Sequence, residues 1–124
     1  MPTVIAVGVA GALGALARYG VEGVVSRHAP GAFPWGTFVV NISGSFVIGV
    51  LFVVLTDHLT VDPWIRSLAM IGFLGSYTTF STLSLESYRL LEDGAWGLAL
   101  LNTLGSLAAG LLAVYLGIVV GRAL

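Results

Sequence analysis

The side chains that could do chemistry in this sequence are uncharged amides and hydroxyls set inside long apolar runs. Thr37, Asn41 and Ser45 recur at every fourth position, so one face of a helix would carry all three. Polar groups at membrane depth are costly, and they usually mark a transport or binding site. We therefore expect this stripe to line a pore or a ligand site, with interhelical hydrogen bonding by Asn41 as the structural alternative.

A second polar segment, residues 72–84, holds seven hydroxyl groups and two glycines. Glycines and adjacent β-branched threonines lower helix propensity, and Ser and Thr side chains offer the backbone other hydrogen bonds. We expect a helix broken near its middle here, and a continuous hydroxyl-rich helix is the alternative. Carbonyl groups freed by a break must lie inside protein or beside water. Converging at a dimer axis, such oxygens could hold a hard cation such as Na⁺.

The elements that must position these residues are membrane spans. Of the 124 residues, 57% are hydrophobic and only 9% are charged, with a mean hydropathy of +1.01. A soluble domain carries about 25% charged residues. A helix needs about 20 apolar residues to cross the lipid core. The sequence therefore predicts an all-α integral membrane protein, a single domain over residues 1–124, with four transmembrane helices at residues 4–25, 35–56, 64–91 and 95–121.

Composition excludes several other classes of function. The net charge is −1, so nothing favours nucleic acid as a partner. There is no cysteine for a disulfide or a thiolate. His28 and His58 both fall in expected loops, so no nucleophile–base set can be placed in the membrane and we expect no enzyme. Because no basic region precedes the first apolar run, we expect that helix to be retained.

The arginines give almost no preferred orientation. Four spans put both termini on one side, with Arg66 and Arg122 there and Arg27 and Arg89 opposite, while Arg18 leans toward the second side. Such a chain can insert both ways, and two opposed copies can form a two-fold dimer. We expect an antiparallel dual-topology dimer, with one fixed orientation as the alternative.

Small residues recur on the first and last expected helices. Gly8, Gly11 and Gly14 are spaced by three residues, and Gly117 and Gly121 form a GxxxG pair. Such residues allow close backbone approach in lipid, either within one bundle or between subunits. Arg18 and Glu22 are four residues apart, so a local ion pair is possible.

Two transporter families have this size and span count. Small multidrug-resistance transporters, which are proton-coupled exporters, use a carboxylate in the middle of helix 1, whereas residues 10–14 here contain no acid. Residues 11–19, 36–46 and 72–82 together resemble the Fluc (CrcB) fluoride channels. The resemblance implies a passive channel that exports cytoplasmic fluoride and protects the cell from it. It also implies a double-barrelled antiparallel homodimer in the inner membrane of a prokaryote, with a central structural Na⁺.

The resemblance also assigns roles to individual residues. Pore-lining residues would be Asn41, Phe80, Thr37, Ser81, Thr82 and Ser106, with Asn102 and Thr103 also on the fourth helix. Charged positions near the vestibules would be Arg18 and Glu86. The carbonyl groups of Gly75 and Thr78, two from each subunit, would hold the Na⁺.

One position departs from the family pattern. The family usually reads Thr-Thr-Phe-Ser-Thr-Phe, and here Leu83 takes the place of the second phenylalanine. Either the pore works with the ring of Phe80 alone, or conduction is weaker, or the chain pairs with a different subunit in a heterodimeric channel.

Overall fold

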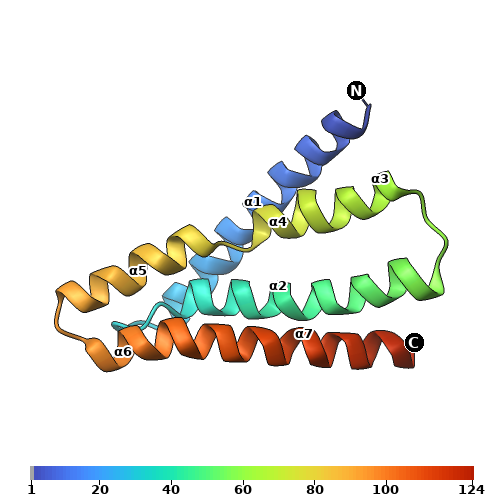
Figure 1. Ribbon diagram of the computed structural model, residues 1–124. Helices are drawn as coiled ribbons and strands as arrows, with labels where there is room; N and C mark the ends of the chain where they lie inside the picture. The colour runs from blue at the N-terminus through green and yellow to red at the C-terminus, as the bar shows by residue number, and fades with distance from the viewer. Residues whose placement is uncertain (1) are drawn as a thin grey trace.

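The computed structural model describes residues 2–124 and is helical almost throughout. Within these residues, four helices are long and apolar enough to cross a membrane (Figure 1). They are Pro2–His28, Trp35–His58, Pro63–Glu92 and Trp96–Ala123. The all-helical, four-span architecture expected from composition is confirmed.

Each span is built from the segments that Figure 1 labels. The first is α1 (Pro2–His28), and the second is α2 (Trp35–Val53) continued by a π-helical stretch (Val54–His58). The third contains α3 (Pro63–Arg66), a π-helical stretch (Ser67–Leu74), α4 (Gly75–Tyr77) and α5 (Phe80–Glu92). The fourth contains α6 (Trp96–Leu100), a π-helical stretch (Leu101–Gly105) and α7 (Ser106–Ala123).

The ends of the spans extend beyond the apolar runs. The first span continues to His28, where the sequence suggested residue 25, because Arg27 and His28 lie in its last turn and suit a helix C-terminus. Pro63 opens the third span, at a position where its missing N–H costs nothing. Gly94 has φ +76° and allows the tight turn between α5 and α6.

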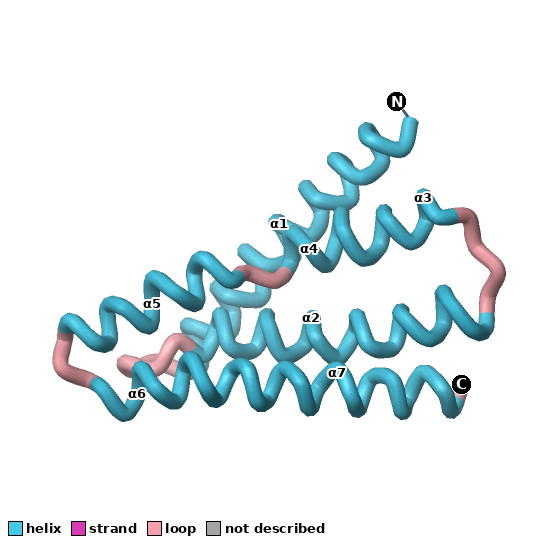
Figure 2. Tube along the Cα trace, in the orientation of Figure 1, coloured by secondary structure: helices cyan, strands magenta, loops and turns pink. Residues whose placement is uncertain are grey.

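The spans form two layers that meet at one end (Figures 1 and 2). The second and fourth spans run side by side, with α2 and α7 packed along most of their length. The third span lies across from them, and α1 crosses obliquely against its first half. Both termini lie at the same end of the molecule, as an even number of spans requires (Figure 1).

Glycines bring the backbones of α2 and α7 into contact. A Cβ atom on Gly117 would overlap the carbonyl group of Phe46, and one on Gly49 would overlap that of Val114. Gly121 likewise faces Val50 of α2. The GxxxG pair therefore packs within this chain, which is the bundle interpretation of the two that the sequence left open.

This contact gives a first testable prediction. Gly117→Ala should lower the free energy of unfolding by about 1–3 kcal/mol, because the methyl group meets backbone atoms that cannot move aside. Gly97→Ala is the matched control, since nothing lies within 4 Å of a Cβ at that helical position. Thermal unfolding in detergent measures both. Equal melting temperatures for the two variants would contradict the packing described.

Candidate functional site

The third span is interrupted at its middle by two residues with extended backbone. Helix α4 ends at Tyr77, Thr78 has ψ 160°, Thr79 has φ −149° and ψ 121°, and α5 begins at Phe80. Figure 2 draws this interruption as a loop between α4 and α5. The N–H and the hydroxyl of Thr78 both donate to the Leu74 carbonyl at 3.0 Å, which closes the last turn before the interruption.

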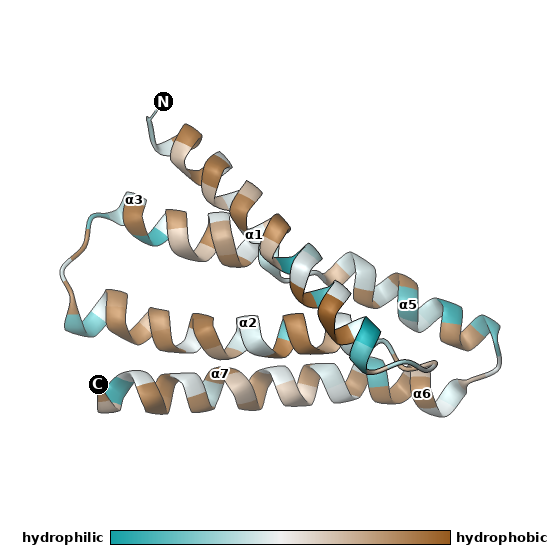
Figure 3. Ribbon diagram, turned by 180° about the vertical axis from the view of Figure 1, so that it is seen from behind, coloured by the Kyte–Doolittle hydropathy of each residue, from teal (hydrophilic) through white to brown (hydrophobic). Residues whose placement is uncertain are grey.

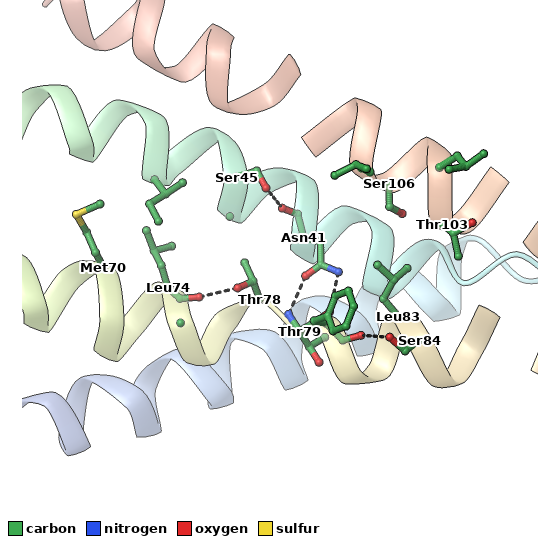
Figure 4. Close-up of a pocket in the computed structure, with 16 residues that line it drawn as sticks. Asn41, Ser45, Met70, Leu74, Thr78, Thr79, Leu83, Ser84, Thr103 and Ser106 are labelled. Atoms are coloured by element: carbon green, nitrogen blue, oxygen red, sulfur yellow. Dashed lines mark hydrogen bonds between the residues drawn. The ribbon is translucent and has the colours of Figure 1, made fainter. Parts of the chain in front are cut away.

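The Asn41 side chain pairs with the backbone of the interruption. Its Oδ1 accepts the N–H of Thr79 at 2.8 Å, and its Nδ2 donates to the carbonyl of Thr79 at 3.0 Å (Figure 4). An extended residue directs its own N–H and C=O toward the same side, so one primary amide can reach both. Asn41 thus supplies an acceptor for the N–H that Thr79 loses from the helix, as a lipid environment demands, and it adds a donor to the Thr79 carbonyl.

The interruption also redirects the N–H groups that follow it. In a continuous helix, the N–H of Thr79 would bond to the carbonyl of Gly75, and that of Thr82 to the carbonyl of Thr78. Here Thr79 donates to Asn41, and the N–H of Thr82 donates to the Thr79 hydroxyl at 3.3 Å, an N-cap for α5. The carbonyl groups of Gly75 and Thr78 have therefore lost their helical donors. Gly75 is also exposed on the surface of this chain.

Close packing by α1 and α2 holds the interruption in place. A Cβ atom on Gly44 would overlap the Thr78 methyl group, and one on Gly11 would lie 3.1 Å from the Ser76 hydroxyl. Arg18 donates from Nε to the Ser76 carbonyl at 3.3 Å. Among the described residues, Arg18 makes this contact rather than the local ion pair with Glu22 that their spacing allows.

Beside the interruption lies an open groove of about 610 Å³ (Figure 4). Its walls come from α2, the third span and the fourth span, and none of the described residues that line it is charged. The polar lining consists of one amide and several hydroxyls, among them Asn41, Ser45, Thr79, Ser84, Thr103 and Ser106. A mainly apolar groove with a few convergent polar groups is the usual form of a site for a small ligand.

Phe80 and Leu83 also line this groove, and Gly75 and Thr78 form part of its wall. Phe80 is 81% exposed, which is unusual for an aromatic side chain at the centre of a membrane span. Phe80 follows Thr79 directly in the chain and lines the same groove as Asn41. This chain alone therefore leaves the ring and the groove open on one side.

Other residues singled out from the sequence lie outside the groove. Thr37 is only 3% exposed and lies beside the Glu86 carboxyl group, so the face it shares with Asn41 is covered at that level. Ser81 is exposed, and the Thr82 hydroxyl accepts a hydrogen bond from the Thr79 hydroxyl at 3.0 Å. The structure thus brings Asn41, Phe80, Ser106, Gly75 and Thr78 together in one groove, and not Thr37, Ser81 and Thr82.

Glu86 lines a separate hollow of about 310 Å³ at the end of the third span. The loop before α2 and the side chains of Arg89 and Asp93 complete it. Hydrophilic residues gather at this end of the molecule (Figure 3). Within residues 2–124, a buried oxygen of Glu86 and one of Glu22 have no hydrogen-bond partner. Glu86 lies at this charged end, whereas Arg18 lies against Ser76.

On the fourth span, the polar residues divide between the groove and the interior. Thr103 and Ser106 line the groove, while Asn102 is fully buried and donates to the Ser87 hydroxyl at 2.9 Å. Among the described residues, the Ser106 hydroxyl has no partner.

Sequence reasoning did not single out Thr79 as a site residue. The signal for it was its place in a segment of low helix propensity, where a backbone group that leaves the helix needs a side-chain partner.

Comparison with known proteins gives consistent matches over nearly the whole chain. A family model described as "CrcB-like protein, Camphor Resistance (CrcB)" matches residues 5–118. A protein of Magnetococcus marinus named "Fluoride-specific ion channel FluC" is 49% identical over 116 residues, 94% of each chain. Proteins with that name from Geotalea uraniireducens and Nitratidesulfovibrio vulgaris are 47% identical over 124 residues and 43% over 122, covering 100% and 98% of each chain.

Proposed function

This chain belongs to the CrcB-like family, and from that premise we propose that it is a fluoride-specific ion channel whose pore runs along the groove beside Asn41. The protein is a multi-pass membrane protein of a family of channels and not an enzyme. The observation that carries the proposal is the chemistry of the groove. At membrane depth it presents amide and hydroxyl donors, and the described residues that line it carry no charge.

Neutral donors suit the passage of a small, strongly hydrated anion. An apolar tunnel would exclude fluoride because of its desolvation cost. The second N–H of Asn41 and the hydroxyl groups that line the groove would replace part of the hydration that the ion loses. The electropositive edge of the Phe80 ring adds a weak attraction. A fixed positive charge would hold the ion more tightly, but conduction requires that the ion also leaves.

The groove needs a second wall, and a second copy of the chain in the opposite orientation is the proposed source. Phe80 is 81% exposed beside the groove, and the exposed Gly75 lies on the same wall. The arginines are balanced between the two ends, which favours insertion both ways. In a two-fold antiparallel homodimer the same surface serves both copies. Two equivalent grooves would then make two pores.

The carbonyl groups of Gly75 and Thr78 fit a sodium ion at the axis of this dimer. Their helical donors have been redirected to Asn41 and to the Thr79 hydroxyl. Two such oxygens from each subunit would give four uncharged oxygen ligands, the kind that replaces the hydration shell of an alkali cation. The ion would be structural, because it would satisfy these carbonyl groups and join the interrupted spans of both subunits.

The proposed direction of transport follows from the acid–base chemistry of fluoride. Hydrofluoric acid is weak, so it crosses membranes in its neutral form and ionises at cytoplasmic pH. An open anion pore in the plasma membrane of a bacterium lets the trapped fluoride leave. The inside-negative potential helps by about 2.3 kcal/mol per charge per 100 mV. The channel would thus protect the cell from fluoride toxicity.

A heterodimeric channel is the second candidate, and Leu83 is the observation that favours it. Leu83 lines the groove where the family pattern has a second ring, so a partner of different sequence could supply that ring. The drug-exporter alternative lacks support, because the middle of α1 carries no carboxylate.

Liposomes loaded with fluoride or chloride test the proposal. The purified chain should release fluoride on its own and retain chloride. The donors of the groove replace lost hydration well for the smaller anion only. Equal release of the two anions would contradict a selective pore. Release of neither would exclude an active homodimer and leave the heterodimeric subunit.

A further inference from the structure

The Asn41–Thr79 pair lies where the proposed pore meets the proposed sodium site. We propose that Asn41 is a positioning residue of the cation site in addition to a donor in the pore. By accepting the N–H of Thr79, it keeps the carbonyl group of Gly75 available to the cation. This inference rests on the proposed sodium site, and it assigns to Asn41 a second task.

The N–H of Thr79 can bond to one of two acceptors, and the backbone conformation of Thr79 decides which. In the extended form it bonds to Asn41 Oδ1 at 2.8 Å. In a helical form it would bond to the carbonyl of Gly75. Since a buried N–H is almost always paired, losing the first acceptor favours the second. The helix α4 would then gain a residue, and the Gly75 carbonyl would be consumed inside it.

A reciprocal bond adds to the preference for the extended form. Asn41 Nδ2 donates to the Thr79 carbonyl at 3.0 Å, so acceptor and donor on one side chain both stabilise the extended form. The geometry fixes the orientation of the amide as well. Its Oδ1 and one N–H are committed to Thr79, which leaves one N–H for an anion in the groove. The Asn41 side chain therefore positions the backbone of the cation site through Oδ1 and one N–H, and it offers its second N–H to the anion in the pore.

Two substitutions separate these tasks. Asn41→Asp keeps an oxygen that accepts the N–H of Thr79, so the Gly75 carbonyl stays available whether the carboxyl group is ionised or protonated. It has no N–H left for an anion in either form. Asn41→Leu keeps the branched shape and the number of heavy side-chain atoms but removes both the acceptor and the donor. Sodium affinity should survive the first change and fall with the second, while fluoride passage should fall with both.

Sodium affinity is measured without reference to flux, as the rise in melting temperature of the purified dimer when N-methylglucamine is replaced by increasing sodium. Loss of a partner that orients a metal ligand typically lowers affinity about 10- to 100-fold. We expect the half-saturating sodium concentration of Asn41→Leu to rise by that factor, and that of Asn41→Asp to stay near the wild-type value. Asn41→Ala gives the same comparison if the leucine variant does not yield a dimer.

The outcomes distinguish this inference from the function on which it rests. Wild-type affinity in Asn41→Leu and Asn41→Ala, or equal losses in the aspartate and leucine variants, would overturn the positioning role while leaving the channel proposal intact. A wild-type dimer that does not respond to sodium would overturn both this role and the sodium site. Fluoride release from liposomes would still stand as a separate result.

Discussion

Asn41→Asp should reduce fluoride release from liposomes by more than about 100-fold while the protein remains a folded dimer. An ionised carboxylate about 4 Å from the passing anion opposes it by about 4 kcal/mol at an effective dielectric constant of about 20, and about 1.4 kcal/mol corresponds to a factor of ten. If the group is protonated, its single hydrogen takes the place of the bond to Thr79 and none faces the groove. Either form stops the ion.

The matched control lies two residues along the same helix. Ser43 bonds to the Val40 carbonyl and the Tyr77 hydroxyl and does not line the groove. Ser43→Ala should therefore release fluoride at close to the wild-type rate. Retention of most of the wild-type flux by Asn41→Asp would remove Asn41 from the pore.

Phe80→Leu should slow fluoride release about five- to tenfold. The electropositive edge of an aromatic ring is worth about 1 kcal/mol to a suitable partner, and Leu83 leaves Phe80 as the one ring that this stretch offers to the groove. Phe52→Leu is the control, because that ring is also exposed, at 53%, but lies on α2 and does not line the groove. Equal rates for the two variants would show that the ring of Phe80 has no part in conduction.

Leu83→Phe is the companion experiment, since it restores the ring that the family pattern places there. The two positions are three residues apart on α5 and both line the groove. A rise in rate would explain the departure as weakened conduction. An unchanged rate would show that one ring per subunit is enough.

The spans could be predicted from the sequence because lipid imposes a simple requirement. A run long and apolar enough to cross the membrane must satisfy its own backbone, and a helix does so. The predicted ends were less accurate, since polar residues such as Arg27 and His28 continue the helix beyond the apolar run and suit its C-terminus. Composition does not locate the last turn.

The region of low helix propensity in the third span could also be located from the sequence. The side chain that pairs with its backbone could not. The pairing of Asn41 with Thr79 depends on how closely α2 approaches the third span, and Gly44 permits that approach by leaving room for Thr78. Periodicity placed Thr37 on the same face as Asn41. The structure buries Thr37 beside Glu86, because a face shared along one helix can be covered at one level and open at another.

The central claim is that this chain makes a passive pore selective for fluoride, and the reversal potential of its current tests that claim most directly. With fluoride at a tenfold gradient across a planar bilayer and chloride equal on both sides, the current should reverse near the fluoride equilibrium potential, about 59 mV from zero for a monovalent ion. Imposing a tenfold chloride gradient in either direction should leave that value unchanged. A reversal potential that follows chloride, or lies at zero, would contradict the account.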